Sequence, residues 1–135
     1  MSGKEVCMDK KEPLKRKSEI NKKEAAEYHV KEKCLIIQVK QDLDHHNTLS
    51  IREQSDKLLD KGQIKNIVFD FSGTDFMDSS GIGVIMGRYK KIALSGGKIF
   101  VTGINNNLDR IFRMSGLYRI VPKFDSIEEA LAKGR

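Results

Sequence analysis

The sequence is poor in cysteine and contains no long apolar run. Its 135 residues include two cysteines, Cys7 in a polar stretch and Cys34 beside the apolar run LIIQV. Two isolated cysteines argue against a disulfide framework and against a thiolate metal site. No apolar run approaches the roughly 20 residues that a membrane span requires, and the N-terminal stretch MSGKEVCMDKKEPLKRK lacks the apolar centre of a secretory signal. We therefore expect a cytoplasmic protein without a membrane partner.

Aromatic residues are scarce as well, at 7% with no tryptophan, and none lies in the first 24 residues. This stretch carries eight Lys or Arg against five Asp or Glu, a surplus of three in a net charge of +6. The composition predicts a basic extension over 1–24 that is disordered or weakly helical. A solvated tail and an arm for a partner both remain open. Because stacking aromatics are absent, we expect no direct contact with nucleic acid.

The common catalytic and nucleotide-binding motifs are also absent. There is no G-x-x-x-x-G-K-[ST], which excludes a P-loop. Gly81, Gly83 and Gly87 form G-x-G-x-x-x-G, one residue too long for a dinucleotide fingerprint. The pair Ser79 and Ser80 lacks the preceding glycine of a serine hydrolase elbow. We therefore expect none of these three kinds of site, and no cofactor.

Strand-like and helix-like stretches alternate from about residue 25 onward. Their order, ββαβαβαβα with short turns, predicts one α/β domain over 25–135 with a largely parallel sheet. The expected strands cover 26–32, 34–40, 66–71 and 98–103, with a short one near 119–121. The expected helices cover 46–62, 79–94, 105–116 and the residues after Ser126, with Gly62 and Gly116 as stops. The inward face of the second helix is predicted to hold Ile82, Ile85, Met86, Tyr89, Ile92 and Ala93.

Two polar stretches follow strands at their carboxyl ends, where sites collect in such sheets. The first is QDLDHHN, whose Asp44, His45 and His46 suit a Mn or Zn site of a metal-dependent phosphoesterase. In the alternative, Asp44 accepts backbone N–H bonds as the cap of a helix that begins near His45. We expect capping or partner contact, and no bound metal.

The second polar stretch, DFMDSSGIGVIMGRYKK over 75–91, places Ser79 where a helix should start. A hydroxyl in the first turn lies beside unpaired backbone N–H groups and the positive end of the helix dipole. A phosphate there gains hydrogen bonds from those donors, leaves the fold intact and adds about −1.5 to −2 charges to the surface. Ser79 is therefore a candidate phosphorylation site on a docking surface.

Gly83 and Gly87 lie four residues apart and form a smooth strip on the same predicted helix. Glycine permits the close approach of another backbone. Either a partner chain approaches this strip, or the glycines let the helix pack against a neighbour within the domain.

Three motifs, DLDHH, MDSSGIGVIMGRYK and RIFRMSGLYRIV, resemble those of the anti-sigma factor antagonists of the STAS domain family. They most resemble the sporulation type that opposes an anti-sigma F factor. The resemblance covers residues 25–133, so that 25–135 is expected to be a STAS domain. It implies a four- to five-stranded mixed sheet with helices packed mainly on one face.

The resemblance also implies a function, and it implies that the protein is not an enzyme. In this family, the unphosphorylated protein binds an anti-sigma factor that is also a serine kinase and makes it release its sigma factor. The kinase then phosphorylates and inactivates the antagonist, and a metal-dependent serine phosphatase restores it. The nucleotide belongs to the kinase partner.

The family's residues transfer to five positions of this sequence. Ser79 matches the phosphorylated serine, Asp78 precedes it, and Ser80 and Gly81 complete the block. Asp44 matches an acidic position of the surface that contacts the kinase. Together with Gly83 and Gly87, the residues around Ser79 are expected to bind the partner.

Two features depart from the family pattern. Gln41 stands where the family usually has a glycine, so the following turn is expected to differ locally, and the basic extension is not typical. Two alternatives remain open at this point. One is a STAS module of another signalling complex, such as a stress-response assembly, and the other is the phosphoesterase built on Asp44, His45 and His46.

Overall fold

The computed structural model describes residues 24–135, so the prediction that the N-terminal extension is disordered lies outside the described residues. The order of elements agrees with the prediction. The elements are β1 (Ala26–Lys31), β2 (Cys34–Val39), α1 (Thr48–Asp60), β3 (Asn66–Asp70), α2 (Ser79–Ala93), β4 (Ile99–Thr102), α3 (Asn106–Ser115), a 3₁₀ turn (Leu117–Arg119), β5 (Lys123–Phe124) and α4 (Ile127–Gly134).

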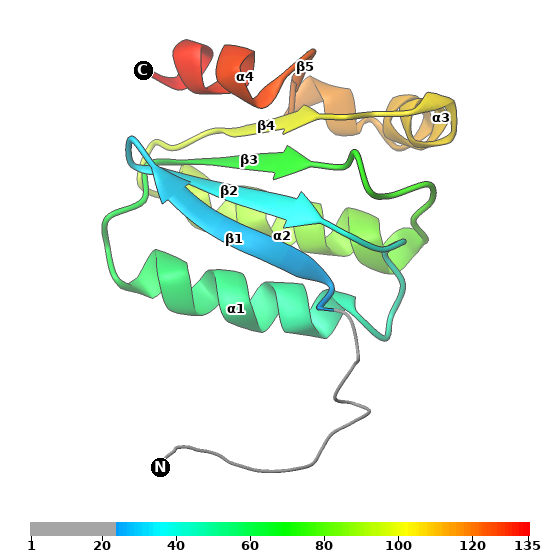
Figure 1. Cartoon of the computed structure of the whole chain (residues 1–135), viewed down its shortest axis with the longest axis horizontal. Coiled ribbons are helices and arrows are strands. Elements are labelled where there is room, and N and C mark those ends of the chain that lie inside the picture. Colours follow the sequence, from blue (N-terminus) through cyan, green and yellow to red (C-terminus); the bar gives the residue numbers. More distant parts are fainter. Residues whose placement is uncertain (1–23) are drawn as a thin grey trace, which may run out of the picture.

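The five strands form one mixed sheet in the order β1-β2-β3-β4-β5. β1 and β2 are an antiparallel hairpin, whereas β2, β3, β4 and β5 run parallel to one another. The crossovers from β2 to β3 and from β3 to β4 are the helices α1 and α2, which lie side by side on one side of the sheet (Figure 1). The fold class predicted from the sequence is therefore confirmed.

Side chains alternate between two cores, one on each face of the sheet. Along β3, Ile67 and Phe69 point into the larger core with Ile85 of α2 and Phe112 of α3. Val68 points the other way, into a smaller core that holds Ala130 and Leu131 of α4. Because β3 is buried on both faces, its sequence is a continuous apolar run rather than an alternating one. Most of the helical packing lies on one face, as expected, and α4 covers part of the other.

The predicted inward face of α2 needs a correction. Val84 and Arg88 are buried together with Ile85 and Ile92, whereas Met86 is 37% exposed. Ala93 is exposed as well. The buried positions 84, 88 and 92 are spaced four apart, so α2 is rotated by about one residue from the predicted orientation. The prediction counted only apolar side chains, and it therefore left Arg88 out of the buried face.

The short strand expected near 119–121 is also misplaced. Those residues follow Gly116, whose φ of 81° ends α3 in the left-handed conformation typical of a helix C-cap. The chain then makes a 3₁₀ turn, and the N–H of Val121 donates to the carbonyl of Leu117 at 2.9 Å. The strand β5 therefore begins only at Lys123, beyond Pro122.

Candidate functional site at the start of α1 and α2

The two polar stretches predicted as separate sites lie side by side. Leu43, in the loop before α1, forms an isolated parallel bridge with Met77, in the loop before α2. The N–H of Leu43 donates to the carbonyl of Phe76 at 3.2 Å, and the N–H of Asp78 donates to the carbonyl of Leu43 at 3.0 Å. Both bridged side chains are buried. The loops 40–47 and 71–78 therefore present one continuous surface.

Further hydrogen bonds hold the two loops together. An oxygen of the Asp42 carboxylate accepts from the N–H of Asp75 at 2.8 Å and from the N–H of Phe76 at 3.1 Å. The Thr74 hydroxyl donates to the carbonyl of Gln41 at 3.0 Å. Gln41, which departs from the family pattern, is thus built into the contact between the loops, and its side-chain oxygen accepts from Asn47 Nδ2 at 3.3 Å.

Asp44 closes the turn that leads into α1. Its Oδ1 accepts from the N–H of His46 at 2.8 Å and from the N–H of Asn47 at 3.2 Å, while Asn47 Oδ1 accepts from the N–H of Asp44. The bond from His46 is the main reason that the pKa of Asp44 lies below its ordinary value. The helix itself begins at Thr48 with Asn47 as N-cap. The prediction that the Asp44 carboxylate accepts backbone N–H bonds is therefore confirmed. The predicted start of the helix near His45 was wrong, because a turn precedes the helix.

The described residues offer no ligand set for the phosphoesterase alternative. Within residues 24–135, no group of three or more His, Cys, Asp or Glu side chains could hold a metal ion. The imidazoles of His45 and His46 tilt against each other with centroids 4.0 Å apart. Burial raises the pKa of the Cys34 thiol to about 11, so this thiol is not an activated nucleophile.

Ser79 is the first residue of α2, and its side chain is exposed. Asp78 is the N-cap of the helix, and its Oδ1 accepts from the N–H of Ser80 at 2.8 Å. The predicted position of Ser79 in the first turn of a helix is confirmed. Its use as a phosphorylation site, and partner contacts by Asp44, Asp78 and Ser80, stay predictions.

The three glycines of α2 have two different roles. A Cβ on Gly81 would lie 2.9 Å from Met77 Cβ and 3.0 Å from Leu43 Cβ. Gly81, expected among the partner-contacting residues, is instead buried and lets the first turn of α2 rest on the bridge between the loops. A Cβ on Gly83 or Gly87 would meet nothing within 4 Å. These two glycines are therefore not needed for packing inside the domain.

Gly83 and Gly87 line a groove of about 370 Å³ between α1 and α2. The groove is lined by Thr48, Leu49, Arg52, Ser80, Gly83, Val84, Gly87 and Arg88. Two large apolar side chains are exposed in this region, Phe76 in the loop before Ser79 at 52% and Leu49 at the groove at 48%. Neither residue is among the site residues predicted from the sequence. An aromatic residue inside the polar loop GTDFMDSS was the signal that could have identified Phe76.

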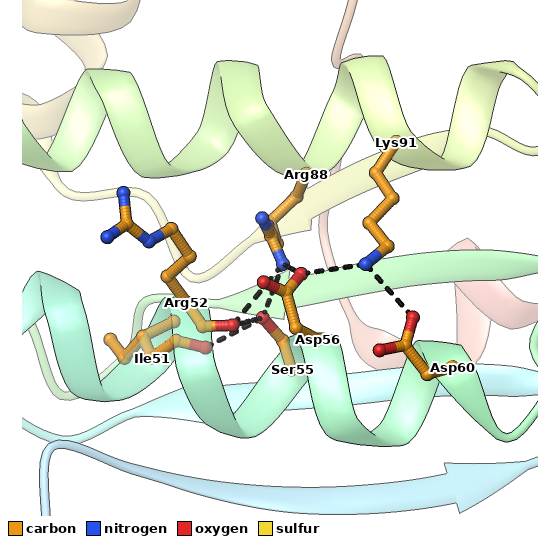
Figure 2. Close-up of polar contacts among 7 residues, drawn as sticks. All are labelled: Ile51, Arg52, Ser55, Asp56, Asp60, Arg88 and Lys91. Atoms are coloured by element: carbon orange, nitrogen blue, oxygen red, sulfur yellow. Dashed lines mark hydrogen bonds and ion pairs between the residues drawn. The ribbon is translucent and has the colours of Figure 1, made fainter.

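A cluster of charges holds the groove's two helices together (Figure 2). Arg88 of α2 donates from Nη1 to the Asp56 carboxylate of α1 and to the hydroxyl of the buried Ser55, at 3.0 Å for the hydroxyl. Lys91 bonds to Asp56 and Asp60, at 3.1 Å each. Burial raises the pKa of Asp56, but the bonds from Arg88 and Lys91 outweigh it and hold that pKa below its ordinary value.

Comparison with known proteins agrees with this architecture. The model of the STAS domain family matches residues 25–130. The chain is 40% identical over 99 residues to an anti-sigma F factor antagonist of Paenibacillus polymyxa, and the match covers 73% of this chain and 85% of that protein.

Within residues 24–135, no helix is long and apolar enough to cross a membrane.

Solved structures of similar proteins have the same fold. The anti-sigma factor antagonist SpoIIAA in its unphosphorylated form superposes with a TM-score of 0.73 at 26% identity, covering 81% of this chain and 95% of that one. The Bacillus cell fate determinant SpoIIAA in the phosphorylated form superposes with a TM-score of 0.67 at 27% identity, covering 82% of this chain and 100% of that one. The family match, the sequence identity and the common fold show that this chain belongs to the STAS domain family.

Proposed function

We propose that this chain is an anti-sigma factor antagonist that is switched by phosphorylation of Ser79. The unphosphorylated form binds an anti-sigma factor that is also a serine kinase, and this binding releases the sigma factor. The chain itself carries no catalytic group in this scheme, and it acts in the cytoplasm. The observation that carries the proposal is the exposed Ser79 hydroxyl at the N-terminus of α2, beside the surface formed by the two joined loops.

The local geometry supports a switch that does not disturb the fold. The Asp78 side chain caps the N–H of Ser80, so the start of α2 is ordered before any phosphate is added. A phosphate on Ser79 stands at the positive end of α2, where the helix dipole favours a negative group. The phosphorylated chain therefore keeps its architecture, in line with its likeness to both an unphosphorylated and a phosphorylated relative.

The change that matters occurs on the docking surface. Phe76 lies three residues before Ser79, and Asp44 follows Leu43, which is bridged to Met77 two residues before Ser79. A partner that covers the joined loops would therefore also cover the serine hydroxyl. Adding about −1.5 to −2 charges beside a packed aromatic side chain makes docking costly, because the partner would have to desolvate the phosphate. Phosphorylation by the kinase then ends the complex, and a metal-dependent serine phosphatase restores the binding form.

Incubation with the cognate serine kinase anti-sigma factor, ATP and Mg²⁺ tests the proposal. Mass spectrometry should locate one phosphate on Ser79, and Ser79→Ala should abolish phosphorylation while keeping kinase binding. Ser80→Ala is the matched control and should still be phosphorylated. Phosphate on another residue, or full-strength binding by Ser79→Asp, would contradict the proposal.

A further inference from the structure

The charged side chains that line the groove between α1 and α2 are all cationic. Two guanidinium groups line it, from Arg52 and Arg88, and none of the eight lining residues is acidic. Arg88 is 5% exposed and is held by Asp56 and Ser55 of α1, yet its Nε is buried without a hydrogen-bond partner among the described residues. The Arg88 guanidinium is therefore fixed in place through Nη1, and its Nε donor is unused.

Arg52 is the second cation of the groove, and it is not held in the same way. Its backbone carbonyl accepts from Arg88 Nη1 at 3.4 Å, but among residues 24–135 no carboxylate pairs with its guanidinium. Figure 2 shows this guanidinium turned away from Asp56, toward the space between the two helices. The Arg52 side chain is exposed. Its charge thus remains available to a group from outside the chain.

The shape of the groove also fits an incoming peptide. Gly83 and Gly87 have open space where side chains would stand, so a partner can approach the backbone of α2 closely. The half-exposed Leu49 supplies an apolar surface beside Arg52, its near neighbour on α1. A partner segment that carries both a carboxylate and an aliphatic side chain could therefore bond to the Arg52 guanidinium and pack on Leu49 at the same time.

We propose that this groove binds an acidic segment of the protein partner, and that the Arg52 guanidinium forms an ion pair with a carboxylate of that segment. The inference rests on the proposed function, because the partner meant is the anti-sigma factor that binds the surface around Ser79. Arg is suited to this role because its planar donors bind a carboxylate in a bidentate manner. Arg88 is a positioning residue, because it fixes α2 against α1 and so keeps the groove open.

The position of the groove connects this inference to the switch. Ser80 lines the groove, and Ser79 is the residue immediately before it. A phosphate on Ser79 places negative charge near the end of the groove and repels an incoming carboxylate. Phosphorylation would thus act on the acidic segment at a distance, in addition to blocking contact at the hydroxyl itself.

Binding of the unphosphorylated chain to the purified anti-sigma factor, measured at several salt concentrations, tests the inference. We expect Arg52→Ala to weaken binding about tenfold and to reduce its salt dependence, and Arg52→Glu to weaken it further. Arg110→Ala removes the same charge from an exposed position of α3 and is the matched control, expected to bind within about twofold of wild type. Thermal unfolding should be the same for all four proteins.

A second variant tests the shape of the groove separately. Gly87→Leu places a side chain in open space, so the domain should fold with unchanged or higher stability while partner binding falls about tenfold or more. If the wild-type chain binds but both Arg52 variants and Gly87→Leu bind equally well, the groove inference is overturned and the proposed function stands. If the wild-type chain does not bind the anti-sigma factor, the proposed function fails and this inference fails with it.

Discussion

Leu43 and Met77 join two loops that belong to different strand-to-helix connections, and Gly81 rests directly on the pair. The loop that carries Asp44 and the loop that carries Phe76 are therefore parts of one rigid support for the start of α2. The position of Ser79 depends on this support, since the helix begins where the bridge ends.

A methyl group on Gly81 should destabilise the fold. Its carbon would lie 2.9 Å from Met77 Cβ and 3.0 Å from Leu43 Cβ, and both of these side chains are buried. We expect Gly81→Ala to lower the free energy of unfolding by about 1–3 kcal/mol, as measured by urea denaturation. Gly83→Ala on the same helix is the control and should raise stability by up to about 1 kcal/mol. Equal stability of the two variants would refute the packing role of Gly81.

Loss of the Arg88 guanidinium should be costly because it removes the buried cation that bonds to both Asp56 and Ser55. We expect Arg88→Ala to lower the free energy of unfolding by about 3 kcal/mol. In a double-mutant cycle with Asp56→Asn, the two losses should be clearly less than additive. Lys91→Ala removes a more exposed cation from the same cluster and should cost under about 1 kcal/mol. Additive losses in the cycle would show that the two side chains do not interact.

The hairpin between β1 and β2 should become more stable when Lys33 is replaced by glycine. Glu32 and Lys33 have φ values of 56° and 64°, which non-glycine residues rarely adopt. Two-residue hairpins of this kind favour glycine at the second position. We expect Lys33→Gly to raise the unfolding midpoint, with a gain of about 0.5–1 kcal/mol. Lys33→Val, which is β-branched, should lower it, and the opposite order of the two variants would refute the argument.

The junction after α3 should weaken in acid. Hydrogen bonds from the Tyr118 hydroxyl at 2.6 Å and from Arg113 Nε at 2.7 Å lower the pKa of Asp109 to about 2. A carboxyl whose folded-state pKa lies below its unfolded value stabilises the fold above that unfolded value, near 4, and the contribution is lost as the pH falls toward 2. Tyr118→Phe should raise the pKa of Asp109, as followed by carboxyl NMR titration. An unchanged titration midpoint in this variant would disprove the role of the hydroxyl.

Phe76 should contribute to partner binding but not to folding. Its side chain is 52% exposed, while its backbone is fixed by Asp42 and Leu43. We expect Phe76→Ala to weaken binding of the anti-sigma factor at least about tenfold, as is common for an aromatic anchor at an interface, with little change in the unfolding midpoint. Met114→Ala removes an exposed apolar side chain from α3 and should leave binding unchanged. Equal effects of the two variants would argue against an anchor at Phe76.

Local patterns were sufficient for most of the fold. The apolar run of β3, the helix stops at Gly62 and Gly116, and the serine at the start of α2 were all read correctly, because each depends on residues close together in the chain. The buried face of α2 was predicted wrongly because an arginine is normally expected at the surface. Arg88 is buried because its guanidinium bonds to Asp56 and Ser55 of α1, and the sequence alone does not indicate this contact. The strand near 119–121 was misplaced because a 3₁₀ turn and a short strand have no strong sequence signature.

By itself, the sequence determined the alternation of strands and helices and the presence of a hydroxyl at a helix start, since hydrophobic periodicity and capping are local properties. Only the tertiary structure decided that the Asp44 loop and the Ser79 loop share one surface and that Gly81 is internal while Gly83 and Gly87 are open. It also decided that, among residues 24–135, no carboxylate pairs with the Arg52 guanidinium. These features depend on which distant segments come into contact, and that is set by the parallel register of β2 and β3 rather than by any single stretch of the chain.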